Sequence, residues 1–415
     1  MKNARLTAFE ILHGVFFDSA YSNLALDSAL KDTDSKDKAF VSRLVYGTVE
    51  RRLTLDYIIA QYLKERTKPK VKTILYLSVY QLYFMDLVPP SAVINEAVKL
   101  AGEVGCSYYK GLINAVLHNI DGNRLDLDSI EDLSVKYSCP KSLIDMWTKH
   151  YAKENALKIL EAINERPPVF AVPNTLFVDT NELAYELLDE GVDCEANGEL
   201  VIIHSAFDLN KSRAFKNGLF HIEDKSSFEC AKALEASEGE TVLDLCSAPG
   251  GKAFTIAERM NNKGMLYAYD LYEQRAKLIE QGAKRLELKN ITVGVNDASA
   301  YNPDLPLADK ILCDVPCSGF GIIRRKPEIR YKELDSIKEL PELQHKILEA
   351  SSKYLKDGGR LVYSTCTLNK KENERVVSRF IENNESFSLV YDKTVFPSVD
   401  GGDGFYYAVI EKKND

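Results

Sequence analysis

The chain has 415 residues, enough for two or three domains that each bury a core. Its 45% hydrophobic and 28% charged residues are ordinary for a soluble globular protein, and no apolar run approaches the roughly 20 residues that cross a bilayer. The first residues, MKNARLTAFEILHG, are typical of an amphipathic helix rather than a signal peptide. We therefore expect a cytoplasmic protein without membrane contact.

The net charge of −9 argues at first against a nucleic-acid partner, but the charge is unevenly distributed. Residues 1–120 carry 15 basic and 12 acidic side chains, so they are net positive, and the rest of the chain is strongly acidic. Basic residues also cluster at Lys64–Lys72 and Ile323–Lys332. Local patches, not total charge, decide phosphate binding, so both clusters are candidate RNA contacts; a solvated charged face is the alternative.

The eight cysteines are scattered along the chain and form no C-x-x-C pair, and no histidine cluster accompanies them. A structural zinc site or a secreted disulfide framework is therefore not expected, and neither is another metal site. In a reducing compartment these cysteines are free thiols, most of them plain buried residues.

Residues 1–125 show apolar side chains at helical spacing throughout, which predicts an all-helical bundle. The apolar segment TILYLSVYQLYFMDL ends before Pro89 and Pro90, and Ser91 is the expected cap of the next helix. The stretches ARLTAFEILHGV, SAVINEAVKLA and YKGLINAVLHNI resemble the NusB family of RNA-binding helical domains. This resemblance implies that Arg5 contacts RNA phosphates; an ordinary surface arginine is the alternative.

Two smaller parts follow the bundle. Residues 126–168 are predicted to be a helical connector that ends at Pro167 and Pro168. Residues 169–225 combine short apolar runs with one helical run, which predicts a small α+β subdomain. We expect this subdomain to pack against the last domain and to extend an RNA surface.

Residues 226–415 alternate between strand and helix patterns, which predicts a doubly wound, mostly parallel sheet. The first strand, TVLDLC, runs into the turn SAPGG and then into a helix from Lys252. Such a turn presents backbone N–H groups to an anionic ligand, and its glycines let that ligand approach. The glycine spacing fits neither a phosphate-binding loop nor a dinucleotide fingerprint, and a plain tight turn is the alternative.

Acidic residues follow three further strands. Asp270 ends MLYAYD, where it can accept hydrogen bonds from ribose hydroxyls, and Asp297 follows ITVGVN, where it can accept from an adenine amine. Asp314 ends KILCD. Because ligands bind at the carboxyl ends of such strands, the three acids beside a glycine turn predict an adenosyl ligand, and the missing dinucleotide fingerprint favours S-adenosylmethionine.

Two cysteines lie at the ends of strands that we expect to be neighbours. Cys317 stands in DVPCSG and Cys366 in STCT. Two thiols beside an acid favour covalent catalysis. A disulfide between them is the structural alternative, and Cys246 and Cys313 are interpreted as core residues.

Together, CSAPGGK, DVPCSG and STCT resemble the RNA cytosine-C5 methyltransferase family over about residues 225–415. With the NusB-like bundle ahead of it, the whole chain resembles the bacterial 16S ribosomal RNA methyltransferases that join these parts. The implied fold is multidomain: an all-α NusB-like bundle, a small α+β subdomain and a Rossmann-like α/β methyltransferase domain. We expect 16S ribosomal RNA as partner and a monomeric protein.

The resemblance also implies roles for individual residues. Cys366 is the thiolate that attacks C6 of cytosine, and Cys317 assists proton removal or product release, with a swap of these roles left open. Asp314 binds the cytosine edge, and Lys252 orients Asp314 or lowers a thiol pKa, with a surface lysine as the alternative. Asp270, Asp297 and Asp314 lie at the cofactor, and the turn cradles its methionine part through Cys246, Ser247, Ala248, Pro249, Gly250, Gly251 and Lys252.

Other functions remain open at this point. A transfer-RNA cytosine-C5 methyltransferase would use the same chemistry. An inactive, antitermination-like RNA-binding factor is a different class, against which the intact Cys317, Cys366 and Asp314 argue. Methylation of an exocyclic amine would need an Asn/Asp-Pro-Pro-aromatic motif, and DVPCSG is not one.

Overall fold

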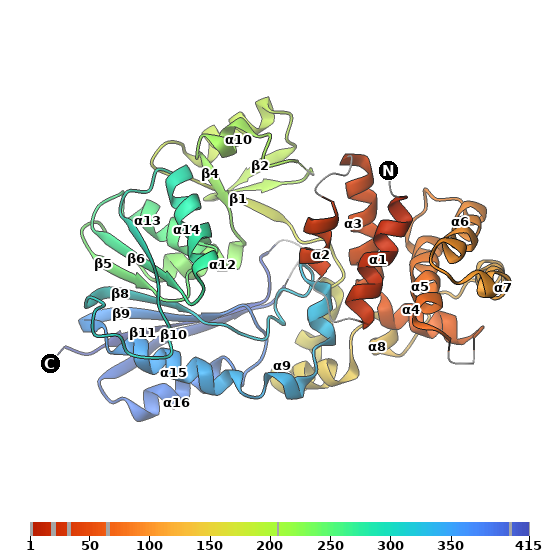
Figure 1. Ribbon diagram of the computed structural model, residues 1–415. Coiled ribbons are helices and arrows are strands. Elements are labelled where there is room, and N and C mark those ends of the chain that lie inside the picture. The colour runs from red at the N-terminus through yellow and green to blue at the C-terminus, as the bar shows by residue number, and fades with distance from the viewer. Residues whose placement is uncertain are drawn as a thin grey trace. The chain divides into compact units, whose positions relative to one another are not determined.

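The computed structural model describes residues 3–17, 22–30, 35–63, 67–205, 207–397 and 401–414. The chain forms two compact units, coloured along the sequence in Figure 1. The first comprises residues 1–146 with 323–332, and the second comprises 147–322 with 333–415. The finer limits expected at residues 125, 168 and 225 remain predictions. In the first basic cluster, Lys64–Arg66 lie outside the described residues.

The first unit is helical in the part that the structure describes. Its elements are α1 (Ala4–Phe17), α2 (Ser22–Ala29), α3 (Ser35–Glu50), α4 (Arg52–Ala60), α5 (Pro69–Phe84), α6 (Pro90–Glu103), η1 (Ser107–Tyr109), α7 (Lys110–Gly122) and α8 (Leu133–Lys136). Helix α5 is apolar on most of its surface, and it is the central helix because α1, α3, α4, α6 and α7 all pack against it. The expected cap at Ser91 is wrong: α6 already begins at Pro90, whose fixed φ suits the first helical position.

A segment from far along the chain completes this unit. Residues 323–332 contain the 3₁₀ turn η2 (Pro327–Tyr331), which contacts α3. Arg330 is only 1% exposed, and its guanidinium donates to the carbonyl oxygens of Glu50 and Ser138 at 3.0 and 3.2 Å. The Tyr331 hydroxyl donates to the carbonyl of Val49 at 2.8 Å. The prediction that the second basic cluster contacts phosphate is therefore wrong for Arg330, because its guanidinium is hydrogen-bonded inside the unit.

The second unit begins within α9 (Lys141–Ala162), a helix that is interrupted at Ala152. A small antiparallel sheet of order β2-β3-β1-β4 follows. The strands of this sheet and the two helices between them are β1 (Val169–Pro173), α10 (Thr180–Asp189), β2 (Cys194–Asn197), β3 (Leu200–Ile203), α11 (Arg213–Lys216) and β4 (Phe220–Ile222). Asn174 Nδ2 donates to the carbonyl of Leu286 at 2.8 Å, and Arg285 donates to that of Phe220 at 2.9 Å. The small subdomain thus packs against the larger sheet domain, as expected.

The large sheet has seven strands in the order β10-β11-β9-β8-β5-β6-β7 (Figure 1). Five are parallel: β5 (Thr241–Asp244), β6 (Met265–Asp270), β7 (Ile291–Val295), β8 (Ala308–Asp314) and β9 (Leu355–Thr365). The antiparallel pair is β10 (Phe387–Val395) and β11 (Phe405–Lys412). The predicted doubly wound, mostly parallel sheet is confirmed.

Helices cover both faces of this sheet, and each face has its own apolar core. One core joins the sheet to α12 (Lys225–Ala233), α13 (Gly251–Arg259) and α14 (Glu273–Arg285). The other joins it to α15 (Leu340–Ser352) and α16 (Glu374–Asn383), with the short turn η3 (Leu334–Ile337) ahead of them. Successive residues of a strand point to opposite faces, so neighbours such as Val242 and Leu243 belong to different cores.

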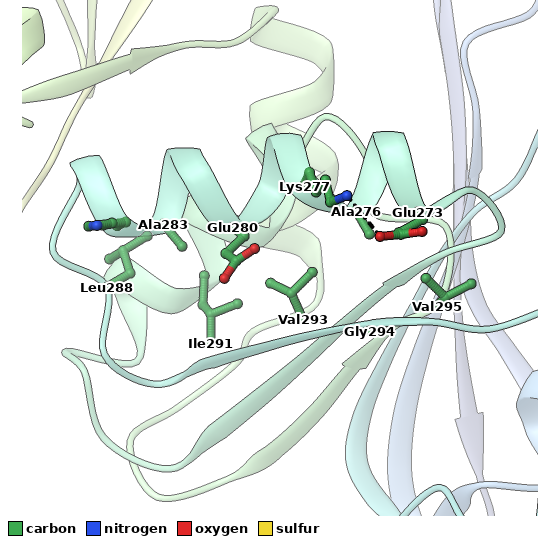
Figure 2. A pocket seen from close by; sticks show the side chains of 11 residues that line it. Glu273, Ala276, Lys277, Glu280, Ala283, Leu288, Ile291, Val293, Gly294 and Val295 are labelled. Carbon is green, nitrogen blue, oxygen red and sulfur yellow. Dashed lines mark ion pairs between the residues drawn. The ribbon is translucent and has the colours of Figure 1, made fainter.

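A shallow pocket of about 440 Å³ lies between α14 and the edge strand β7. Figure 2 shows that apolar residues such as Ile291 and Val293 form one side, and that Glu280 and the Glu273–Lys277 ion pair, 2.8 Å long, lie along the helix. None of the site residues expected from the sequence lines this pocket.

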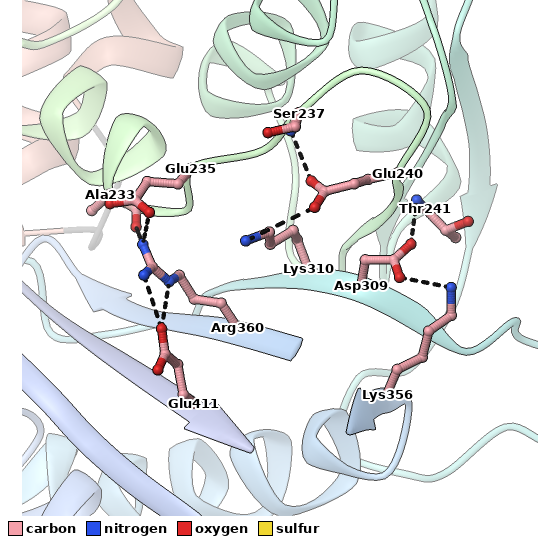
Figure 3. Close-up of polar contacts among 10 residues, drawn as sticks. All are labelled: Ala233, Glu235, Ser237, Glu240, Thr241, Asp309, Lys310, Lys356, Arg360 and Glu411. Atoms are coloured by element: carbon pink, nitrogen blue, oxygen red, sulfur yellow. Dashed lines mark hydrogen bonds and ion pairs between the residues drawn. The ribbon is translucent and has the colours of Figure 1, made fainter. Parts of the chain in front are cut away.

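Charged groups join the amino ends of the parallel strands (Figure 3). Arg360 of β9 pairs with Glu235 at 2.5 Å and with Glu411 of β11 at 2.8 Å. Asp309 of β8 accepts from the backbone N–H of Thr241 and from Lys356. These contacts fix the strand starts at the end of the sheet opposite to the expected ligand end. Within the described residues, no helix has the length and apolar character that a bilayer crossing requires.

Candidate active site

The turn after β5 provides backbone groups at the carboxyl edge of the sheet. Helix α13 begins at Gly251, and Gly250 before it has a φ of 113°, a left-handed conformation that glycine adopts without strain. A side chain at Gly250 would also meet the Phe254 ring at 2.4 Å. The peptide bond between Ala248 and Pro249 is cis. The sequence therefore places open N–H groups of a helix start where an anionic group can bind.

Asp270 lies at the end of β6 and is almost fully buried. Its carboxylate pairs with Arg275 at 3.4 Å and accepts from the backbone N–H of Tyr272 at 3.2 Å. Arg275 also donates to the carbonyl oxygen of Ala248 at 2.8 Å. Arg275 therefore connects the second strand end to the turn, a link that the sequence did not reveal because an arginine inside a helical run carries no distinguishing signal.

Asp297 follows β7 and is exposed, and its carboxylate accepts from the backbone N–H and hydroxyl of Ser299 at 2.9 and 2.7 Å. These bonds lower the pKa of Asp297. The adjacent Asn296 is buried, and its Nδ2 has no hydrogen-bond partner among the described residues. Asn296 therefore offers a free donor at this strand end in addition to the acceptor expected from Asp297.

Lys252 and Asp314 form an ion pair at the centre of the carboxyl edge. Lys252 Nζ lies 2.8 Å from Asp314 Oδ2, and the Ser364 hydroxyl donates to Asp314 Oδ1 at 2.7 Å. Burial alone would lower the pKa of Lys252, but the negative charges of Asp314 and Glu223 raise it. The Lys252 side chain is 12% exposed, so the surface-lysine alternative is wrong.

The two cysteines from neighbouring strand ends meet. Strands β8 and β9 are paired in parallel register, and Cys317 Sγ lies 3.3 Å from Cys366 Sγ. Both are free cysteines, and both are partly accessible. The hydrogen bond with Cys366 and burial raise the pKa of Cys317, and the charges of Glu372 and Asp314 add to this effect.

The residues at this edge fit an adenosyl cofactor with a charged amino-acid part. Besides Asn296 Nδ2, the Oδ2 atom of Asp244 is buried without a hydrogen-bond partner among the described residues, and burial raises the pKa of Asp244 to about 7. Asp244 ends β5, directly before the turn. A buried donor and a buried acceptor that lack partners flank open helix N–H groups, as a polar ligand requires. Within the described residues, no group of side chains is arranged to hold a metal ion.

Further residues that the sequence did not mark hold the loop after Cys366. The indole N–H of Trp147 in α9 donates to the carbonyl oxygen of Leu368 at 3.1 Å. His150, also in α9, accepts from the backbone N–H of Lys370 at 3.3 Å, and burial lowers its pKa to about 4. The middle of the predicted connector thus supports the loop after Cys366.

Comparison with known proteins agrees with this arrangement. Residues 231–411 match the family model described as 16S rRNA methyltransferase RsmB/F, and residues 2–121 match the NusB family. The probable ribosomal RNA small subunit methyltransferase B of Bacillus subtilis (strain 168) is 35% identical over 99% of both chains. The protein of the same name from Synechocystis sp. is 32% identical over 93% of this chain and 91% of its own.

Solved structures show the same fold. The crystal structure of PH0851 matches with a TM-score of 0.83 and 25% identity over 99% of both chains. NSun6 from Pyrococcus horikoshii, solved with SFG, matches 66% of this chain and 99% of its own with a TM-score of 0.61 and 24% identity. Fold and site together define an S-adenosylmethionine-dependent methyltransferase preceded by a NusB-like domain. The chain belongs to the RsmB/F family of 16S rRNA methyltransferases.

Proposed function

We propose that the protein transfers a methyl group from S-adenosylmethionine to carbon 5 of a cytosine in 16S ribosomal RNA through a covalent bond between Cys366 and C6. The observation that carries this proposal is the pair of sulfurs 3.3 Å apart beside Asp314, at the carboxyl edge of the sheet. The names of the bacterial relatives support ribosomal RNA of the small subunit as the substrate.

The chemistry explains why a thiolate is needed. Carbon 5 of cytosine is a poor nucleophile, and addition of the Cys366 sulfur to C6 moves electron density onto C5. When bound, the cofactor supplies the electrophilic methyl group. A base then takes the C5 proton, and the Cys366 sulfur leaves C6 as a thiolate, which restores the aromatic ring. The target base must leave its stack to reach these groups, which is easiest in an RNA loop.

Asp314 is suited to hold the cytosine edge. Lys252 and Ser364 each bond one of its two oxygens, which fixes the carboxylate plane and leaves lone pairs for the exocyclic amine of the base, and for N3–H once N3 is protonated. A carboxylate oriented in advance stabilises the N3-protonated form of the ring, which balances the negative charge that the thiolate brings to C6. Lys252 thus acts through Asp314, one of the two roles expected for it.

Cys317 is suited to assist product release. A thiol keeps its proton at neutral pH, so Cys317 can donate a hydrogen bond to the Cys366 sulfur 3.3 Å away. That donation stabilises negative charge on Cys366 when the bond to C6 breaks. This assignment keeps the order of roles expected from the sequence.

The cofactor contacts follow from the same geometry. The helix start at Gly250 and Gly251 holds the carboxylate of the methionine part, Asp270 holds the ribose, and Asp297 with Asn296 holds the adenine. The helical first unit supplies an RNA surface. In this unit, Arg5 donates to Gln81 at 2.9 Å and its guanidinium lies over the Phe40 ring, so phosphate contact uses its remaining donors. We infer a cytoplasmic monomer.

A methylation assay tests this proposal. Purified protein with labelled S-adenosylmethionine is expected to modify C5 of a cytosine in unmodified 16S ribosomal RNA, and Cys366→Ala is expected to lose the activity by a factor of at least about 1,000. Nuclease digestion and mass spectrometry identify the modified base. Label on a purine, preference for transfer RNA, or an active Cys366→Ala protein would each contradict the proposal.

A further inference from the structure

The loops that carry the two cysteines are joined by one buried carboxylate. Glu372 is 0% exposed and lies just before α16. Its Oε1 accepts from the hydroxyl of Ser318 at 2.6 Å and from the Asn369 amide at 2.8 Å. Its Oε2 accepts from the backbone N–H of Ser318 at 2.8 Å and from the Gln344 amide at 3.0 Å. All four donors are neutral groups.

These donors come from both sides of the sulfur pair. Ser318 follows Cys317 directly, Asn369 belongs to the loop after Cys366, and Gln344 of α15 also donates to the carbonyl oxygen of Pro316 at 3.0 Å. Glu372 therefore binds residues on the Cys317 loop and on the Cys366 loop at the same time. A change in the position of one loop would break hydrogen bonds that hold the other.

Direct bonds between the loops continue this connection. The hydroxyls of Ser318 and Thr367 lie 2.6 Å apart, and the backbone N–H of Phe320 donates to Thr367 Oγ1 at 3.2 Å. The backbone N–H of Gly321 donates to the carbonyl oxygen of Cys366 at 3.0 Å. A buried polar network of this kind rigidifies its members and favours one arrangement, although Gln344 Oε1 lacks a partner among the described residues.

We propose that Glu372 is a positioning residue for methyl transfer, which holds the Cys317 and Cys366 loops together so that both sulfurs face the same base. This proposal rests on the proposed function and extends it to a residue that touches neither the base nor the cofactor. A misplacement of about 1 Å in such a site can cost about 100-fold in rate, so the network has a direct catalytic consequence.

Glu372 also acts on the sulfurs through its charge. The hydrogen bond with Cys366 and burial raise the pKa of Cys317, and the charges of Glu372 and Asp314 raise it further. Burial and the nearby Cys317 likewise raise the pKa of the Tyr363 hydroxyl group. The negative charge of Glu372 disfavours a thiolate at Cys317. Removal of this charge without loss of shape should therefore let Cys317 ionise at lower pH.

The experiment compares Glu372→Gln and Glu372→Ala in the full chain with the matched variant Glu374→Gln. Glu374 is a half-buried carboxyl group two residues away, and its partners Lys370 and Thr394 are not among the four donors that bind Glu372. Single-turnover methylation of 16S ribosomal RNA is measured at saturating S-adenosylmethionine, well below the unfolding temperature of each variant. We expect the rate to fall about tenfold in Glu372→Gln and about 100-fold in Glu372→Ala, with Glu374→Gln unchanged.

A second readout does not depend on methylation. In a Cys366→Ser background, the rate at which iodoacetamide labels Cys317 is followed against pH by peptide mass spectrometry. We expect Glu372→Gln to lower the midpoint of this profile relative to the same background with Glu372 intact. A residue that only stabilised the fold would change the unfolding temperature and leave this midpoint in place.

The outcomes separate the two proposals. A wild-type protein that methylates cytosine, together with a slowed Glu372→Gln variant and a shifted labelling midpoint, supports the role of Glu372. Wild-type rate and an unshifted midpoint in Glu372→Gln overturn it. Failure of the wild-type protein to methylate cytosine overturns the proposed function instead, and the labelling midpoint still decides whether Glu372 controls Cys317.

Discussion

The state of the sulfur pair depends on which cysteine carries the proton. The hydrogen bond with Cys366, burial and two nearby carboxylates all raise the pKa of Cys317. A protonated Cys317 is a hydrogen-bond donor to the sulfur that must leave the base.

Replacement of Cys317 should trap the reaction after the covalent bond has formed. In Cys317→Ala the Cys366 sulfur lacks its hydrogen-bond donor at the moment of departure, so a protein–RNA adduct is expected to accumulate as a slow band on a denaturing gel. The matched control is Cys313→Ala, which removes a fully buried thiol from β8. Equal adduct in both variants, or none in either, would contradict the role of Cys317.

The principal site residues were predictable because they follow apolar strands. A strand that ends in Asp314 and one that is followed by Cys366 must present these groups at one edge of a parallel sheet, and the motifs fix which residues they are. Glu372, Arg275 and Trp147 were not predictable. Each acts through contacts with residues distant in sequence, and a buried glutamate looks like a surface glutamate until the fold is known.

At the scale of secondary-structure elements, a buried histidine joins the small sheet to helix α13. His221 of β4 lies 3.4 Å from Glu258 and 3.5 Å from Glu223, and the hydroxyl of Thr255 donates to Glu223 at 2.7 Å. Burial alone would lower the pKa of His221, but the charges of Glu258 and Glu223 raise it to about 9. The folded protein therefore keeps this histidine charged above neutral pH.

The contact between β4 and α13 should contribute less to the free energy of unfolding as pH rises. An unfolded histidine titrates near pH 6.5, so the stabilisation from His221 is fully present below that pH and is lost as pH rises through about 9. The difference in free energy of unfolding between wild type and His221→Gln should shrink by on the order of 3 kcal/mol between pH 6 and pH 9.5. Trp147, the only tryptophan of the chain, lies in the same unit and reports urea unfolding. If this difference in free energy of unfolding did not depend on pH, the claim that His221 is charged in the folded protein would be wrong.

Most elements followed from periodicity, and the exceptions have physical causes. Strand β10 was not predicted because it is an edge strand whose middle residues are exposed, so it lacks an apolar run. The cap at Ser91 failed because proline is already favoured at the first helical position. Local sequence thus predicts elements that are buried on at least one face better than those at the margin of the sheet.

At the scale of the whole molecule, the two units are interleaved along the chain. Residues 323–332 leave the second unit only a few positions after Cys317, complete the first unit and then return. No sequence signal indicated this exchange, because the segment is basic and resembles a solvated face. Its burial depends on Arg330, whose donors meet the carbonyl groups at the end of α3 and after α8.

Replacement of Arg330 should loosen the first unit selectively. Arg330→Met leaves the buried carbonyl oxygens of Glu50 and Ser138 without this donor, at a cost of about 2 kcal/mol. Hydrogen exchange of the full chain should then rise at least about tenfold in peptides of α3 and stay unchanged in β5 and β6. Lys326→Met, at an exposed position of the same segment, is the control. Unchanged exchange in α3 would show that the segment does not support this unit.

The most direct measurement identifies the residue that bonds to the RNA. Transcripts of 16S ribosomal RNA that contain 5-fluorocytosine hold the adduct, because fluorine on C5 cannot leave as a proton does. After incubation with S-adenosylmethionine, digestion and mass spectrometry should find the methylated base attached to the peptide that contains Cys366. Attachment through Cys317, or no covalent product, would contradict the assignment of Cys366 as the nucleophile.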